Sequence, residues 1–305
     1  MDGFNGVQNA QNEALCNLTP PVSHGGQNYN DGLGSTSNPK FNKYTINLDM
    51  LTFCAKGLIF KDSKEVGEEV FERGNFVFTK HIIKKGKVDV TGNFNYEYTY
   101  RIAERYNEVL HDIGLLFTCV REGRVIDKEL SKIEIDNKIL YERGFSFRLC
   151  ELLKALDVSF NNFTRIDIAI DGARHLDNYR FYSTSDEYEK VGRAKVTTIQ
   201  DAKCKVETFY IGNRKSGKMV RGYCKSQEID EKLLGGKVNK EYIKEFWENN
   251  SLDTSNDIDR LEIELHRKPI EELSIHGKPL GLAGLEDTRV LASIARNHID
   301  KFYQF

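Results

Sequence analysis

A tyrosine flanked by cations is the residue of this sequence best suited to nucleophilic chemistry. Alternation along an expected strand over 218–225 places Arg221, Tyr223 and Lys225 on one face. Flanking cations favour a phenolate, so we expect the pKa of Tyr223 to lie below its ordinary value near ~10. An arginine can also bind a phosphate through two parallel hydrogen bonds. The three side chains therefore suit phosphotyrosyl transfer, with a nucleophile, a phosphate clamp and a second stabilising charge.

The same residues also fit a purely structural role. The chain contains 14 tyrosines, and a tyrosine in a sheet commonly packs its ring and keeps its hydroxyl near water. On this feature alone the structural role is the more common outcome. Tyr210, in the preceding expected strand, is a competing nucleophile.

Carboxylates line one face of two further expected strands. Asp167 and Asp171 share a face of the first strand, and Glu262 and Glu264 share a face of the second, with His266 beside them as a source of a nitrogen ligand. If the two strands are neighbours, these carboxylates converge, and their mutual repulsion requires a cation or raised pKa values. Oxygen ligands suit Mg²⁺ or Mn²⁺. The pattern therefore indicates a divalent-metal site.

Salt bridges are an equally good interpretation of this spacing. Arg165 and Arg260 lie beside the acids and could neutralise them. The segments 165–171 and 260–266 are also alike, since each begins with arginine, a further residue and an acid, and continues with apolar residues at alternate positions. Their likeness predicts that the two strands lie side by side in one sheet.

A cluster of positive charge surrounds the tyrosine, although the net charge of the chain is only −2. We expect Arg214, Lys215 and Lys218 to contact DNA phosphates, while a solvated charged face is the ordinary alternative. Glu207 is the only acid from 203 to 225. The cations of this segment are Lys203, Lys205, Arg214, Lys215, Lys218, Arg221 and Lys225.

The rest of the chain predicts one folded region behind a polar tail. Residues 1–39 contain no lysine or arginine and are rich in glycine, asparagine, glutamine and serine, so we expect a disordered tail there and one domain over 40–305. No segment resembles a signal peptide or a membrane span, which predicts a cytoplasmic protein. The six cysteines form no C-x-x-C pair, so neither a zinc ribbon nor a redox motif is indicated.

The expected elements mix strand runs with a few helices, which predicts an α+β fold with a central, largely antiparallel sheet and flanking helices. The expected strands begin near Tyr44 and include 97–102, 115–121, 132–136, 163–171, 207–211, 218–225 and 260–266, with 212–217 as a hairpin turn. The expected helices are 148–156, 238–250 and a last one from about Glu286.

Three segments, in this order, resemble the plasmid replication initiation factors of the Rep_trans family, which act in rolling-circle replication of small bacterial plasmids and have phage-borne relatives. The segments are FTRIDIAID (163–171), YIGNRKSGKMVRGYCK (210–225) and RLEIELHRKPIEEL (260–273). With the strand and helix before them, the resemblance covers roughly residues 130–273. The sequence departs from the family at Gly222, in place of an apolar residue, and at Cys224, in place of a polar one.

The resemblance implies a Rep-like nuclease domain in which Tyr223, within an Arg-x-Tyr-x-Lys motif, is the nucleophile and Tyr210 is not. It also implies dependence on a divalent metal, Mg²⁺ or Mn²⁺, without the two-histidine motif of other rolling-circle nucleases. The tyrosine would become linked to a 5′ phosphate at a replication origin and free a 3′ hydroxyl. The implied partners are origin DNA, a host helicase and a polymerase, and the resemblance leaves room for a homodimer.

Two other functions fit the same residues. A mobilisation relaxase would use the same tyrosine for DNA transfer, and a DNA-binding regulator on the same scaffold would not cut at all. From the strand faces, Asp167 and Glu262 are the expected principal metal ligands, with Asp171 and Glu264 as further candidates.

Overall fold

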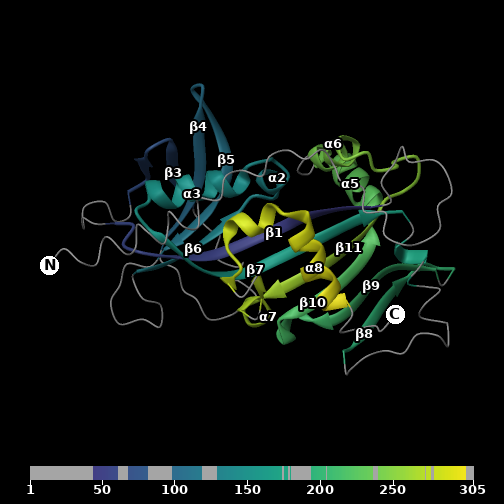
Figure 1. Ribbon diagram of the computed structural model, residues 1–305. Coiled ribbons are helices and arrows are strands. Elements are labelled where there is room, and N and C mark those ends of the chain that lie inside the picture. Colours follow the sequence, from purple (N-terminus) through teal and green to yellow (C-terminus); the bar gives the residue numbers. More distant parts are fainter. Residues whose placement is uncertain are drawn as a thin grey trace. The chain divides into compact units, whose positions relative to one another are not determined.

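The computed structural model has an α+β fold with several helices and a large antiparallel sheet (Figure 1). It describes residues 44–60, 68–81, 98–118, 129–173, 175–177, 179, 194–203, 205–235, 240–271, 273–275 and 278–299. Over these residues the sheet has 11 strands in the order β2-β3-β4-β5-β6-β1-β7-β11-β10-β9-β8. The predicted α+β class with a largely antiparallel sheet is therefore confirmed. None of the helices within these ranges has the length and apolar character needed to cross a membrane.

The chain divides into two compact units. The first comprises Met50–Arg165 and Gly281–Ala283, and the second comprises 44–49, Ile166–Leu280 and the chain from Gly284 onwards. The strands β1 (Tyr44–Lys56) and β7 (Ser159–Gly172) contribute residues to both units. The expected tail, 1–39, lies outside the described residues.

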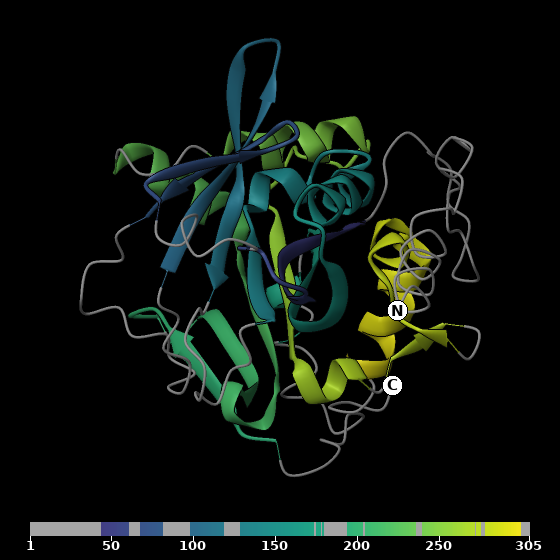
Figure 2. The same cartoon turned by 90° about the vertical axis from the view of Figure 1, so that its left-hand side faces the viewer.

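The first unit packs aromatic side chains between short strands. The rings of Phe71 and Phe78 stack with centroids 4.5 Å apart, and the buried Tyr100 meets Phe71 edge-on. Its longest hairpin, β4–β5, projects from the unit (Figures 1 and 2). The hairpin turns at Asn107 and Glu108, whose φ angles of 49° and 62° match the tight turns that join twisted antiparallel strands. The elements are β2 (Val70–Arg73), β3 (Phe76–Lys80), β4 (Tyr98–Tyr106), β5 (Val109–Thr118), β6 (Leu130–Ile135), α2 (Asn137–Leu140) and α3 (Phe145–Ala155).

The second unit is built on β7, β11, β10, β9 and β8, which lie side by side in that order. The strands are β8 (Val196–Gln200), β9 (Val206–Asn213), β10 (Lys218–Cys224), β11 (Asp259–His266), β12 (Ser274–Ile275) and β13 (Lys278–Pro279). The helices are η1 (Arg214–Ser216), α5 (Lys225–Leu234), α6 (Glu241–Asn249), α7 (Arg267–Glu271) and α8 (Thr288–Ile299), while η2 (Leu282–Glu286) spans the boundary between the units.

Several sequence predictions are confirmed. The strands predicted at 163–171 and 260–266 fall within β7 and β11, which are neighbours in the sheet. The predicted hairpin turn at 212–217 joins β9 and β10, although Gly212 and Asn213 still pair in the ladder and the turn itself is 214–217. The helix predicted at 148–156 is α3, whose Leu149, Leu152 and Leu153 are buried.

Other boundaries were wrong. The strand predicted at 115–121 is the end of β5, which begins earlier, at Val109. Its start was missed because no glycine or proline marks the tight turn at 107–108. The strand predicted to run through Lys225 ends at Cys224, and Lys225 begins α5. The strands β2, β3 and β8 and the helix α5 were not predicted.

Candidate functional site

The hydroxyl of Tyr223 lies inside the second unit between a carboxylate and an ammonium group. It donates a hydrogen bond to Glu262 Oε2 at 3.1 Å and accepts one from Lys225 Nζ at 3.2 Å. The side chain is only 4% exposed. Tyr223 and Lys225 of the sequence motif therefore do lie together, and Glu262 of the neighbouring strand joins them. They form a buried network and do not lie on an open strand face.

Burial reverses the predicted direction of the tyrosine pKa. The expectation was that flanking cations would favour the phenolate, yet the pKa of Tyr223 lies well above its ordinary value, chiefly because burial disfavours the charged form. The positive charge of Arg260 opposes this rise, while the negative charges of Glu262, Glu228 and Asp49 add to it. The hydroxyl is therefore firmly protonated, and it needs a proton acceptor to react.

Arg221 lies against the face of the tyrosine ring. Its guanidinium carbon is 3.8 Å from the centroid of the Tyr223 ring and 5.9 Å from that of the Tyr210 ring. In the β10–β11 ladder Arg221 is opposite Glu262. Its Nε atom is buried and has no hydrogen-bond partner among the described residues. The guanidinium therefore places a positive charge against the tyrosine, which suits an anion such as a phosphate, although the enclosed Nε itself is not accessible to one.

Lys225 lies beside Tyr223, as the sequence predicted, although it belongs to the helix α5 and not to the strand. Its side chain is 1% exposed and its Nζ donates to Glu228 Oε2 at 2.6 Å as well as to Tyr223. Burial is the main reason why its pKa is lowered to about 8. Glu228 also pairs with Lys232 and, at 3.7 Å, with Lys240. Burial raises the pKa of Glu228, but Lys225 first, and then Lys232 and Lys240, overcome this effect and lower the pKa to about 2.

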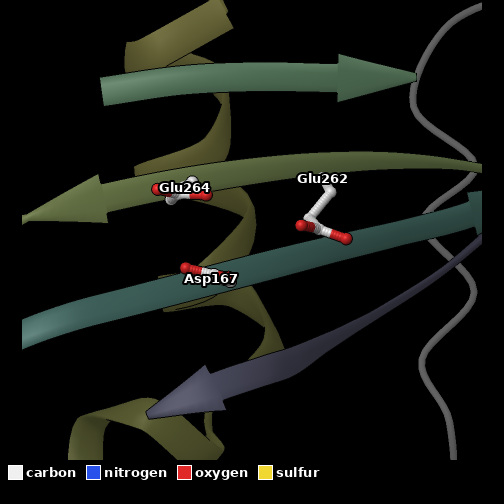
Figure 3. Close-up of side chains that lie close together, drawn as sticks. All are labelled: Asp167, Glu262 and Glu264. Carbon is white, nitrogen blue, oxygen red and sulfur yellow. The ribbon is translucent and has the colours of Figure 1, made fainter. Parts of the chain in front are cut away.

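Three carboxylates converge beside this network. Asp167 on β7 and Glu262 and Glu264 on β11 each offer an oxygen atom, and these atoms all lie within 4.8 Å of one another (Figure 3). Asp167 is 2% exposed and Glu264 is 1% exposed, so water screens little of their repulsion. The adjacency of β7 and β11 brings the three together, as the sequence predicted for these residues.

Glu264 is also held by two nitrogen donors. Arg214 Nε lies 3.0 Å and 3.2 Å from its two carboxylate oxygens, and His266 Nε2 lies 2.7 Å from Oε1. A candidate metal ligand and a salt bridge thus meet on one residue, but the arginine of this ion pair is Arg214, whereas Arg165 and Arg260 were the expected partners of the acids. His266, expected as a nitrogen ligand, contacts Glu264 itself.

Asp171 belongs to a different group of residues. Its carboxylate accepts hydrogen bonds from Arg260 Nε at 2.6 Å and Nη2 at 2.7 Å, and from Trp247 Nε1 at 2.7 Å. Arg260, which is fully buried, also pairs with Asp49 on β1. Asp171 shares a strand face with Asp167, but it lies four residues further along, about 13 Å at the usual rise of a strand. It therefore lies outside the carboxylate group and is satisfied by structural partners.

The donor set of the carboxylate group fits a hard divalent cation. All of its members offer oxygen, the ligand that Mg²⁺ and Mn²⁺ prefer. Two oxygens on opposite sides of one Mg²⁺ are about 4.2 Å apart, twice the Mg–O bond of ~2.1 Å, so oxygens within 4.8 Å need little movement to share an ion. Asp167, Glu262 and Glu264 are the residues that would hold it.

The cations expected to contact DNA lie at the β9–β10 turn. Arg214 has a side chain that is 60% exposed even though it reaches Glu264, and Lys215 is exposed, while Lys218 is partly buried. This turn adjoins the end of β11 that carries Glu264, because Lys218 pairs with Leu265 in the ladder. The positive charge predicted from sequence is thus placed next to the carboxylate group.

Sequence reasoning missed the residues that enclose the site, namely Glu228, Trp247, Lys240 and Asp49. Glu228 could have been found if a helix had been expected after the tyrosine, because it is three residues from Lys225 and so on the same helix face. Trp247 is the only tryptophan of the chain, yet nothing in its surroundings links it to Asp171, which is 76 residues away.

No protein-family model matches this chain, and no curated protein does either. Its function therefore has to be inferred from the arrangement of these side chains.

Proposed function

We propose that this protein initiates rolling-circle replication by cutting one DNA strand at an origin with Tyr223. The observation that carries the proposal is the direct hydrogen bond from the Tyr223 hydroxyl to Glu262, a member of the carboxylate group. A nucleophile, a proton acceptor and a candidate metal site are thereby contiguous on neighbouring strands of one sheet. The replication role itself comes from the family resemblance.

The proposed step exchanges one phosphodiester for another. The Tyr223 oxygen attacks the phosphorus, the bond from phosphorus to the 3′ oxygen breaks, and the 5′ phosphate stays on the tyrosine. Glu262 Oε2 is positioned to accept the phenolic proton, and solvent supplies a proton to the departing 3′ oxygen. The free 3′ hydroxyl then primes a polymerase, and the reverse reaction rejoins the strand because the bond energy is conserved in the protein–DNA link.

The cations around the tyrosine stabilise charge in this step. Lys225 Nζ already donates to the hydroxyl oxygen and would stabilise the phenolate that forms. Arg221, whose guanidinium lies against the Tyr223 ring, would place a positive charge beside a phosphate bound there. A divalent cation on Asp167, Glu262 and Glu264 would act as a Lewis acid on the phosphate when bound.

The burial of Tyr223 favours a second candidate, a DNA-binding regulator that does not cut. A side chain that is 4% exposed and has both hydrogen bonds made inside the protein is well suited to a structural role. In that case the positive turn at Arg214 and Lys215 would bind DNA without any covalent step.

Covalent capture separates the two candidates. The protein would be incubated with supercoiled plasmid carrying the DNA that flanks its own gene, with Mn²⁺ or Mg²⁺, and stopped with detergent. We expect relaxed circles with protein attached, and neither product with EDTA.

The variant Tyr223→Phe removes one oxygen and should abolish both products while retaining DNA binding. Tyr210→Phe is the matched control and should retain most of the activity. An adduct that persists in Tyr223→Phe and disappears in Tyr210→Phe would assign the nucleophile to Tyr210, and absence of any adduct would favour the regulator.

A further inference from the structure

One row of side chains crosses four strands of the second unit and ends at the carboxylate group. The ladders pair Thr197 on β8 with Tyr210 on β9, Tyr210 with Arg221 on β10, and Arg221 with Glu262 on β11. Directly opposed residues of an antiparallel sheet point to the same face. An aromatic ring, a guanidinium and a carboxylate are therefore presented in sequence along one line.

The next row on this face contains the tyrosine of the site. It runs from Ile199 through Thr208 and Tyr223 to Arg260. Tyr210 is a diagonal neighbour of Tyr223, a separation of about 7–8 Å between such positions. A single nucleotide spans this distance, so a phosphate at Tyr223 places an adjoining base near Tyr210.

The β8 end of this surface is open. Thr197 is exposed and Ile199 is 49% exposed, in contrast to the buried Tyr223 and Arg260 at the β11 side. Tyr210 is only partly buried, and the Arg221 guanidinium carbon lies 5.9 Å from the centroid of its ring and 3.8 Å from that of Tyr223. Arg221 Nε is enclosed by protein and has no hydrogen-bond partner in the described part of the chain, so it is the charge of the guanidinium, and not this atom, that can attract an anion here.

From these observations we infer that Tyr210 is a base-stacking residue, which holds the nucleobase next to the phosphate bound at Arg221 and Tyr223. A partly exposed ring beside the open β8 strand offers a stacking surface to any base, while the guanidinium near it attracts the backbone. The ligand is a single-stranded stretch of nucleic acid, since only an unpaired base exposes its face. This inference rests on the proposed function for the identity of the phosphate as the scissile one.

The test measures binding without cleavage. The full chain would be titrated, in EDTA, with a fluorescent twelve-nucleotide thymidine oligonucleotide and with an abasic oligonucleotide of the same length. Loss of one stacked base costs about 1–3 kcal/mol, so Tyr210→Leu should weaken binding of the thymidine strand by roughly fivefold or more. The abasic strand, which has phosphates but no bases, should bind both proteins equally.

Two variants serve as controls for the stacking role. Tyr210→Phe keeps the ring and should bind the thymidine strand like the parent protein. Tyr106→Leu removes a tyrosine that is 67% exposed in the first unit and should have no effect. If Tyr210→Phe is as weak as Tyr210→Leu, or if Tyr210→Leu binds both strands like the parent, the stacking role is refuted.

A measurement on the unaltered protein covers the case in which Tyr210→Leu does not fold. Photo-cross-linking with 5-iododeoxyuridine strands should attach the nucleobase to Tyr210, as mapped on the digested protein, and attachment only at other residues would overturn the inference. Failure of the proposed function is distinct, because it appears as absence of the covalent adduct. A protein that stacks bases through Tyr210 but forms no adduct would be a binder with the same platform.

Discussion

The hydrogen bonds of Tyr223 explain how a buried phenol could still react. Burial keeps the hydroxyl protonated, so the cations named by the motif do not activate it in advance. The acceptor Glu262 and the donor Lys225 instead contact the same oxygen from two sides. A proton can thus leave towards the carboxylate while the ammonium group stabilises the remaining charge.

The lowered pKa of Lys225 predicts how the rate of the proposed strand cleavage depends on pH. Its pKa is lowered to about 8, so it loses its proton, and with it the charge that stabilises the phenolate, as the pH rises through that value. We expect the initial rate of adduct formation to decrease about tenfold per pH unit above pH ~8. Burial is the main cause of this lowered pKa, and the charges of Arg260, Asp49, Glu228 and Lys240 also affect it.

The conservative variant Lys225→Arg tests this assignment, because arginine stays charged throughout the accessible range. Its rate should show no decrease over the pH range in which the parent protein loses activity. Lys232→Arg, which changes another cation paired with Glu228, should leave the decrease where it is. A parent rate that keeps rising above the pKa of Lys225 would mean that neutral Lys225 acts as a base and not as a stabilising charge.

The sequence predicted which side chains share a face and that the two strands carrying the acids are neighbours, but not that Asp171 lies apart from the carboxylate group. The alternation of isoleucine with acids in 163–171 was sufficient to predict that the acids share one face, because side chains alternate across a strand. It could not separate Asp167 from Asp171, since their partners, Glu264 in one case and Trp247 in the other, come from distant parts of the chain. The predicted direction of the tyrosine pKa was wrong for a related reason, because burial depends on distant segments that cover the strand.

At the scale of the strand pair β9–β10, Gly222 on β10 leaves room for the Phe209 ring of β9. Gly222 is opposite Phe209 in the ladder, and a Cβ at residue 222 would lie 2.1 Å from the Phe209 ring. The ring of Tyr179 stacks on Phe209 at 3.9 Å, which restricts its movement. The glycine at residue 222 thus has a packing reason, since the Phe209 ring occupies the space of a side chain.

Gly222→Ala should therefore destabilise the protein. Overpacking a filled interior typically costs about 1–3 kcal/mol, and we expect a loss in that range in the free energy of unfolding measured with urea. In the background of Phe209→Ala, which leaves a cavity, the same change should cost much less or stabilise the protein. Equal costs in the two backgrounds would show that the Phe209 ring is not what the glycine accommodates.

At the scale of the whole molecule, the carboxylate group should couple metal binding to folding. Asp167 on β7 and the two glutamates on β11 converge only when the sheet is formed, so a cation binds the folded chain in preference to the unfolded one. At a concentration one hundred times the dissociation constant, the stabilisation is about 2.7 kcal/mol. Added Mn²⁺ or Mg²⁺ should therefore raise the Tm in a concentration-dependent way.

The variant Asp167→Asn should lose this rise in Tm, while Glu271→Gln, at an exposed ion pair outside the group, should retain it. Calorimetry of the metal-free proteins provides the baseline for both. A rise in Tm that is unchanged in Asp167→Asn would place any metal binding elsewhere in the chain.

Charge placement, and not net charge, should govern the affinity for DNA. The net charge is −2, yet the β9–β10 turn presents Arg214, Lys215 and Lys218 next to the site. Each phosphate that is neutralised releases counterions and adds about −0.9 to the slope of log affinity against log salt on duplex DNA. Because Arg214 is already paired with Glu264, we expect the lysines to contribute most, and replacing all three by alanine should reduce the slope by about 2.

A matched triple variant separates this turn from positive charge in general. It replaces the exposed Lys56, Lys138 and Lys154 of the first unit by alanine and should leave the slope unchanged. Titrations of the turn variant on origin and random duplexes should show the same reduction, because phosphate contacts position the protein and base contacts specify the sequence. An unchanged slope in the turn variant would locate the DNA-binding surface away from the β9–β10 turn.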